Sequence, residues 1–134
     1  MARKRILIAD DEPDIITLLV SILKSEDYDV ITASDGAEAL MAIKISHPDV
    51  VILDIMMPKL DGMQVLQKVR EDAEISSIPV IMLTAKASDK DILSGYKYGA
   101  NYYIPKPFEI SDILEGVRMV LKPLKGKGKR FKIS

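Results

Sequence analysis

The sequence contains no cysteine, which excludes disulfides, thiol nucleophiles and zinc sites built on thiolates. It also lacks a long apolar run near its start. Only residues 6–9 are apolar before Asp10 and Asp11 interrupt, which is too short for a signal peptide or a membrane span. No internal repeat, hydrolase triad or nucleotide-binding glycine loop is visible. We therefore expect a soluble, unprocessed protein of the cytoplasm that does not enter the membrane.

The chain that remains has the composition of one globular domain. Its 134 residues are 48% hydrophobic and 29% charged, enough for one core and too few for a large enzyme. The net charge of −1 hides an asymmetry, because residues 122–134 carry six basic side chains and no acidic one. We predict a domain over residues 1–121 followed by a basic, flexible tail over 122–134. The tail has the charge to touch nucleic acid or an acidic partner, but a solvated end is the commoner outcome.

Short apolar runs alternate with segments of helical periodicity along the whole domain. The runs are too continuous for a half-exposed antiparallel sheet, so we interpret them as buried parallel strands. The predicted strands cover residues 6–9, 30–33, 50–53, 80–83 and 102–104. The predicted helices cover residues 13–25, 35–45, 62–70, 88–98 and 109–121.

This alternation predicts an α/β doubly wound fold of the flavodoxin-like (βα)5 type. The common strand order for that size is 2-1-3-4-5, with helices on both faces of one sheet. Strands one, three, four and five then lie side by side, and their carboxyl ends converge on one crevice, where such folds bind ligands.

Polar residues follow four of the five runs, at the ends that this order brings together. Asp10 and Asp11 follow the first run, Asp54 the third, Thr84 the fourth, and Lys106 lies just after the fifth. Three carboxylates suit a hard divalent cation such as Mg²⁺, whereas a hydroxyl and an ammonium suit a phosphoryl group. The pattern therefore indicates phosphate chemistry at one edge of the sheet.

Each of these residues also has a structural interpretation when it is taken alone. Asp10 and Asp11 are favourable at the start of a helix, whose amino end is positive. A strand-end threonine often bonds to backbone, and a lysine between two prolines also suits a surface turn. Asp54 is harder to explain this way, because an uncompensated buried carboxylate costs several kcal/mol.

Four sequence motifs together resemble the receiver domain of two-component response regulators. They are IADDE at residues 8–12, DIMMPKLDG at 54–62, LTA at 83–85 and KPF at 106–108. Their order, spacing and strand placement all agree with that family, and the resemblance covers residues 4–121.

The resemblance implies a function and a role for each residue. Asp54 would accept a phosphoryl group from a sensor histidine kinase or a histidine phosphotransfer protein, and Thr84 and Lys106 would bind the phosphoryl oxygens. Such a domain is a signalling component rather than an enzyme, although it assists its own phosphorylation and dephosphorylation. The implied ligands of Mg²⁺, or of Mn²⁺ in its place, are Asp11, Asp54, the backbone carbonyl of Met56 and, through a bound water, Asp10.

The same resemblance implies a switch. Thr84 would move toward the phosphoryl group and Tyr103 would rotate inward, changing the face formed by the fourth helix, fifth strand and fifth helix, which binds a downstream protein. The alternative for Tyr103 is a plain core aromatic of the fifth strand. Met56 and Lys86 occupy the two positions that tune dephosphorylation in this family. Rapid dephosphorylation in the family goes with polar or acidic residues that orient water there. Met56 cannot orient water, and Lys86 could add an ion pair to the phosphate, so we expect a long-lived phosphoform.

Other outcomes stay open. An aspartate-nucleophile phosphatase also combines aspartates, a threonine, a lysine and Mg²⁺. Its nucleophile ends the first strand with a second aspartate two residues on, and the residues Asp-Asp-Glu-Pro at 10–13 do not match that pattern. A receiver that works without phosphorylation is the other alternative. We expect a monomer or a phosphorylation-dependent dimer, and no nucleic-acid binding without an output domain. The contacts of winged-helix regulator dimers are matched at Arg118 and not at Ile92, Lys97 or Gly116.

Overall fold

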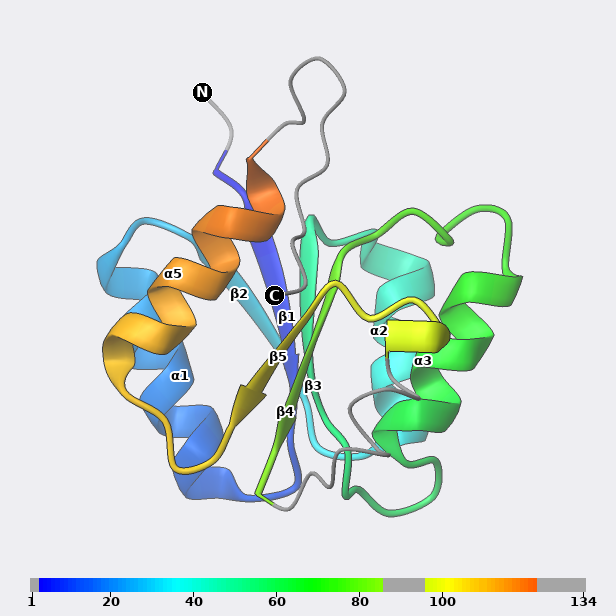
Figure 1. Ribbon diagram of the computed structural model, residues 1–134, viewed down its shortest axis with the longest axis horizontal. Coiled ribbons are helices and arrows are strands. Elements are labelled where there is room, and N and C mark those ends of the chain that lie inside the picture. Colours follow the sequence, from blue (N-terminus) through cyan, green and yellow to red (C-terminus); the bar gives the residue numbers. More distant parts are fainter. Residues whose placement is uncertain (1–2, 86–95, 123–134) are drawn as a thin grey trace.

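The computed structural model describes residues 3–85 and 96–122, and a five-stranded parallel sheet forms its centre (Figure 1). The strand order is β2-β1-β3-β4-β5, which confirms the predicted doubly wound order. Each strand is one residue longer than its apolar run, because backbone pairing extends to the flanking polar residue or proline. The strands are β1 (Arg5–Ala9), β2 (Asp29–Ala33), β3 (Val50–Asp54), β4 (Val80–Thr84) and β5 (Tyr102–Pro105).

Helices cover both faces of this sheet. On one face lie α1 (Pro13–Ser25) and α5 (Ile110–Leu121), and on the other α2 (Gly36–Ser46) and α3 (Gly62–Glu71) (Figure 1). Their bounds agree with the predicted ones to within one residue at every end. The helix predicted over residues 88–98 lies mostly outside the described residues, as does the tail beyond residue 122. No helix in the described part of the chain has the length and apolar character needed to cross a membrane.

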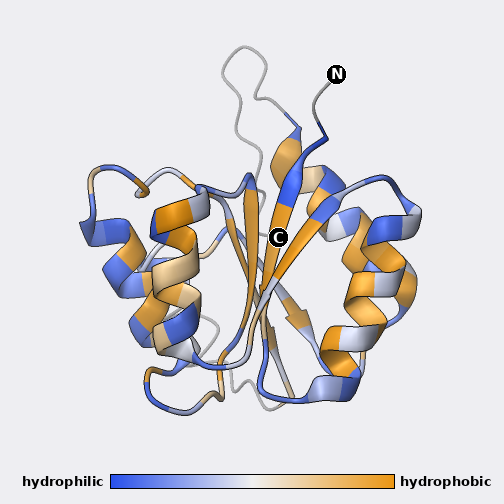
Figure 2. Ribbon diagram, turned by 180° about the vertical axis from the view of Figure 1, so that it is seen from behind, coloured by the Kyte–Doolittle hydropathy of each residue, from blue (hydrophilic) through white to orange (hydrophobic). Residues whose placement is uncertain are grey.

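The sheet separates two apolar cores. Ile6 and Ile8 of β1 belong to the core under α1 and α5, whereas Leu7 belongs to the core under α2 and α3. Every residue of β3 and β4 is buried, and both strands contribute residues to both cores. Figure 2 shows the apolar colouring of the central strands and of parts of the helices beside them. Burial of one such Ile or Leu side chain contributes about 1.5–3 kcal/mol, which fixes the central strands and the residues at their ends.

A partly buried guanidinium fixes the edge strand β5 to its neighbour. Arg70, near the end of α3, donates hydrogen bonds to the carbonyl oxygens of Gly99 and Ile78, each at 2.7 Å, and to Asn101 Oδ1 at 2.8 Å. The same Asn101 oxygen accepts from the backbone N–H of Val80 at 2.9 Å. Burial lowers the pKa of the Arg70 guanidinium. The start of β5 is thereby tied to the start of β4 and to α3, which positions the loop that follows β5.

Two glycines allow the loop after β3 to lie close against its surroundings. A Cβ atom on Gly36 would overlap the carbonyl oxygen of Leu60, and one on Gly62 would overlap the carbonyl oxygen of Asp54. The backbone N–H of Gly36 also donates to the carbonyl oxygen of Pro58 at 3.3 Å. The segment from residue 54 to residue 62 is therefore packed onto the start of α2 by backbone contacts that a side chain would prevent.

Candidate functional site

The predicted residues meet at the carboxyl ends of adjacent strands. Asp10 directly follows β1, Asp54 is the last residue of β3, Thr84 is the last residue of β4, and Lys106 directly follows β5. The backbone N–H of Lys106 donates to the carbonyl oxygen of Thr84 at 2.7 Å, so these two residues are neighbours. The Lys106 side chain reaches back across the sheet to Asp10 and Asp54. The convergence expected from the strand order is thus confirmed.

The Lys106 ammonium lies among three carboxylates. Its Nζ atom is 2.9 Å from Glu12 Oε1, 3.0 Å from Asp10 Oδ2 and 3.5 Å from Asp54 Oδ2. The lysine side chain is 10% exposed and those of Asp10 and Asp54 are 5% exposed or less, whereas that of Glu12 is 59% exposed. Two partners of the ammonium are therefore buried with it, and the third lies at the surface.

The Asp54 carboxyl is held in an unfavourable environment for its charge. Burial, and next the negative charge of Asp10, raise its pKa from 3.8 to about 6, although Lys106 and the backbone N–H of Met56 act in the opposite direction. The Met56 N–H donates to Asp54 Oδ1 at 3.2 Å. At neutral pH the carboxylate is mostly ionised, and it is only weakly stabilised, which leaves it available for a cation or an electrophile.

The Lys106 side chain experiences the opposite balance. Burial lowers its pKa, but the hydrogen bond with Glu12 and the nearby negative charges of Asp10 and Asp54 outweigh burial and raise the pKa above its usual value. Lys106 therefore remains an ammonium throughout the physiological range, a fixed positive charge at the acidic end of the sheet.

The acidic residues form a group that fits a divalent cation. Carboxylate oxygens of Asp10, Glu12 and Asp54 all lie within 4.8 Å of one another. One of them, Asp10 Oδ2, is buried and accepts no hydrogen bond of good geometry despite its 3.0 Å approach to Lys106. One ammonium cannot balance three carboxylates, so the excess negative charge and the oxygen donors suit a hard cation.

The site differs from the sequence analysis in its third acid. Asp11 is exposed and is not part of the group of three, which instead includes Glu12, a residue that sequence reasoning did not single out. The signal available was the acidic run 10–12. Whether Asp11 ligates a metal, and whether the Met56 carbonyl does so, stay predictions. Lys86 lies outside the described residues.

The predicted switch residue Tyr103 is half-buried on β5 and packs against the core under α2 and α3. Its ring centroid is 5.7 Å from that of Tyr96, with the ring planes at 54°. Burial, together with Tyr102, raises the pKa of the Tyr96 hydroxyl. Tyr96 and Tyr98 are each 46% exposed, so an aromatic surface does lie beside β5, and the rotation of Tyr103 stays a prediction.

A family model described as the response regulator receiver domain matches residues 6–118. The chain belongs to that family. It is 44% identical over 122 residues to the probable transcriptional regulator ycf27 of Porphyridium aerugineum, covering 91% of this chain and 50% of the relative. Against the alkaline phosphatase synthesis transcriptional regulatory protein PhoP of Bacillus subtilis it is 43% identical over 119 residues, 89% of this chain and 49% of the relative. The chain spans about half the length of the curated relatives it matches.

Solved receiver structures have the same fold. The chemotaxis protein CheY4 of Vibrio cholerae superposes with a TM-score of 0.85 at 32% identity, covering 90% of this chain and all of that one. This similarity confirms the flavodoxin-like α/β architecture. The protein is accordingly a receiver domain of two-component signalling, a family whose members interact with histidine kinases and phosphotransfer proteins.

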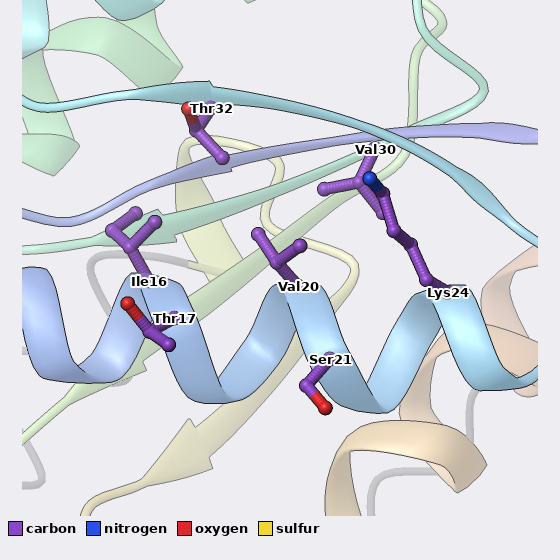
Figure 3. A pocket seen from close by; sticks show the side chains of 7 residues that line it. All are labelled: Ile16, Thr17, Val20, Ser21, Lys24, Val30 and Thr32. Atoms are coloured by element: carbon purple, nitrogen blue, oxygen red, sulfur yellow. The ribbon is translucent and has the colours of Figure 1, made fainter.

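A groove between α1 and β2 lies apart from this chemistry. It is lined by apolar Ile16, Val20 and Val30 and by polar Thr17, Lys24 and Thr32 (Figure 3). None of the residues that line it belongs to the acidic group or follows a central strand. The groove is therefore a feature of the sheet edge and not part of the candidate site.

Proposed function

We propose that the chain is a phosphoacceptor switch in which Asp54 takes a phosphoryl group from a phosphohistidine donor. The observation that carries the proposal is the Asp54 carboxylate itself, buried beside Asp10 and only 3.5 Å from the Lys106 ammonium. An ordinary core does not retain a charged group in such a place, because the same volume filled with apolar atoms would be more stable. A function at this carboxylate explains why it is there.

The proposed reaction moves one phosphoryl group. A carboxylate oxygen of Asp54 forms a bond to phosphorus while the bond from phosphorus to the donor histidine nitrogen breaks, and the electron pair leaves with the imidazole. Lys106 contributes positive charge near the phosphoryl oxygens, and the Thr84 hydroxyl is the second group proposed to bind them. The product is an aspartyl phosphate on β3.

The acidic end of the sheet would hold Mg²⁺ through Asp54 together with Asp10 or Asp11 and the Met56 carbonyl. When bound, such a cation neutralises negative charge that gathers as a phosphoryl group approaches the carboxylates. Without it, the excess negative charge around Asp54 repels the donor. This requirement predicts that phosphorylation depends on a divalent cation.

The output of this proposed switch is a change of surface. In this proposal Thr84 and Tyr103 would transmit phosphorylation to the face of β5 and α5. The half-exposed Tyr96 and Tyr98 supply aromatic side chains of the kind that favours protein interfaces. We propose that a cytoplasmic kinase or phosphotransfer protein is the donor and that another protein reads this face. The curated relatives are named transcriptional regulators, and the activities of those longer proteins are not assumed for this chain.

The deciding experiment is intact mass after incubation with Mg²⁺ and acetyl phosphate. Wild-type protein should gain one phosphoryl group that hydroxylamine removes, and Asp54→Asn should gain none. Asp49→Asn is the matched control, because Asp49 lies just before the other end of the same strand, and it should behave as wild type. Gain by Asp54→Asn would refute the proposal, as would no gain by wild type even with a phosphorylated histidine donor.

The same reaction separates the receiver from an aspartate-nucleophile phosphatase. A receiver takes up about one phosphoryl group and then consumes further acetyl phosphate only as fast as its aspartyl phosphate hydrolyses, which is slow. A phosphatase instead releases phosphate from small esters continuously. Rapid, sustained hydrolysis of such esters would favour the phosphatase.

We also propose a long-lived phosphoform. The exposed Met56 side chain has no group that can orient water, and Lys86 would add an ion pair to the phosphoryl group. Met56→Asn with Lys86→Glu should therefore accelerate loss of the phosphoryl group, measured by intact mass over time after the donor is removed. An unchanged rate would contradict this idea.

A further inference from the structure

The Lys106 ammonium already has a carboxylate oxygen within 3.5 Å for each of its three N–H donors. A lysine ammonium carries three N–H donors. Two of them form hydrogen bonds, to Glu12 at 2.9 Å and to Asp54 at 3.5 Å, and Asp10 lies at 3.0 Å from the same nitrogen. An oxygen of an incoming phosphoryl group must therefore replace one of these three carboxylates before Lys106 can bind it.

The three carboxylates differ in how easily they can leave. The side chains of Asp10 and Asp54 are 0% and 5% exposed, so moving either away from the ammonium would leave a carboxylate buried without a partner. The Glu12 side chain is 59% exposed and regains full hydration when it turns outward. Displacing Glu12 is therefore the least unfavourable way to free a donor on Lys106.

The backbone of Glu12 is fixed by hydrogen bonds in which its side chain takes no part. Its N–H donates to Asp10 Oδ1 at 2.9 Å, and its carbonyl accepts from the N–H groups of Ile15 and Ile16 at 3.1 and 3.2 Å. Glu12 occupies the cap position of α1, yet its side chain makes no capping hydrogen bond. The Glu12 carboxylate is thus directed to Lys106 instead of to the helix end behind it.

We infer that Glu12 is a positioning residue. In the resting protein its carboxylate occupies the place beside Lys106 that a phosphoryl oxygen takes later. The Glu12 side chain turns into solvent when the phosphoryl group arrives. The inference rests on the proposed function of Asp54 and adds a specific competitor to it. Glu12 slows phosphorylation by this competition and keeps the resting lysine from closing fully on Asp54.

Two Glu12 variants and one control test the inference. Glu12→Ala removes the carboxylate, and Glu12→Asp keeps the charge but is one methylene too short to reach Lys106. Asp14→Ala is the matched control, because Asp14 is an exposed acid in the first turn of the same helix and forms no ion pair with any other described residue. If the Glu12–Lys106 contact matters, both Glu12 variants differ from wild type. If only the loss of one negative charge matters, Glu12→Ala and Asp14→Ala differ from wild type and Glu12→Asp does not.

The first measurement is made on the resting protein in EDTA and needs no phosphorylation. In nitrogen-15 NMR spectra of the lysine ammonium groups, the Lys106 protons should exchange with water faster in both Glu12 variants than in wild type or Asp14→Ala. Equal exchange in all four proteins would overturn the inference, because Glu12 would then not hold the lysine.

The second measurement is the rate of phosphorylation by acetyl phosphate at saturating Mg²⁺. Loss of one competing hydrogen bond should raise the rate by about threefold to tenfold in both Glu12 variants, with Asp14→Ala unchanged. A rate that is unchanged or lower in the Glu12 variants would overturn the competition. A loss of Mg²⁺ affinity of about tenfold in both would overturn it too, since Glu12 would then be a metal ligand.

The two measurements distinguish failure of the Glu12 inference from failure of the function proposed for Asp54. If wild type and Asp14→Ala gain no phosphoryl group, the proposed function of Asp54 fails and the competition fails with it. If both are phosphorylated and the Glu12 variants match them in rate and in proton exchange, only the inference about Glu12 fails.

Discussion

The charged groups at the two ends of the sheet differ in their exposure and in how they are paired. At the amino ends of the strands, Arg3 and Asp29 form an ion pair at 3.7 Å with both side chains more than half exposed, and Asp49 accepts a hydrogen bond from the backbone of Arg5 at 2.7 Å. At the carboxyl ends, three carboxylates share the single ammonium of Lys106. Charges at the first end are matched with partners in water, whereas those at the second are crowded and mostly buried.

This contrast indicates where stability has been exchanged for function. Solvent-exposed ion pairs contribute about 0–1 kcal/mol, so the amino end could be altered with little consequence. The carboxyl end holds like charges within 4.8 Å of one another, which destabilises the folded state as long as no cation balances them. Substitutions at the two ends should therefore differ in size, and some should differ in sign.

The largest effect is expected from removing the one positive charge at the carboxyl end. Lys106→Met should lower the free energy of unfolding by about 3 kcal/mol at pH 7.5 in EDTA, because Asp10 and Asp54 lose their buried partner. Urea denaturation measures it, with Lys44→Met on the exposed side of α2 as the control. A loss no larger than that of the control would mean that the acids do not depend on the lysine.

Removing a negative charge at the same end should have the opposite sign. Asp54→Asn should raise the free energy of unfolding by about 2 kcal/mol at pH 7.5 in EDTA, since a raised pKa means that the folded state disfavours the ionised form. The folded pKa of about 6 exceeds the ordinary 3.8, so wild-type stability falls as pH rises between these values. The variant lacks this fall.

The difference between wild type and Asp54→Asn should therefore be near zero at pH 4, grow toward pH 6 and become constant above about pH 7. Asp49→Asn, outside the crowded cluster, should show a difference that does not follow this course. If the Asp54→Asn difference is independent of pH, then the buried charge is not its cause.

The smallest effect is expected at the amino end. Asp29→Asn breaks the exposed ion pair with Arg3 and should change the free energy of unfolding by less than about 0.5 kcal/mol, an effect that 1 M salt removes. Urea denaturation at low and high salt is sufficient to measure it. A cost above about 1 kcal/mol that persists in high salt would show that the two ends are more alike than their exposure implies.

Much of this arrangement was predictable from residue order alone. The apolar runs identified all five strands, and the distribution of Asp10, Asp54, Thr84 and Lys106 among run ends agreed with the strand order that the structure confirms. The runs gave strand ends one residue short, since pairing of Arg5 or Asp29 is a backbone property that hydrophobicity does not report.

Contacts that depend on side-chain reach were not predictable. Sequence reasoning assigned no role to Glu12, because its contact with Lys106 joins residues 94 positions apart. The hydrogen bonds of Arg70 to the loop before β5 were also missed, because an arginine late in an amphipathic helix normally lies in solvent. In both cases the partner is set by the path of a distant loop, which local patterns do not contain.

The site is assembled from the beginning, middle and end of the domain, and this has a consequence for its synthesis on the ribosome. Asp54 is made 52 residues before Lys106, a delay of roughly 3–10 s at typical elongation rates. During that interval a nascent chain carries the carboxylates without the lysine, and β4 has no β5 beside it. If Asp54 is the phosphoacceptor proposed above, a complete acceptor site would exist only after nearly the whole domain has been translated, so unfinished chains would not be phosphorylated.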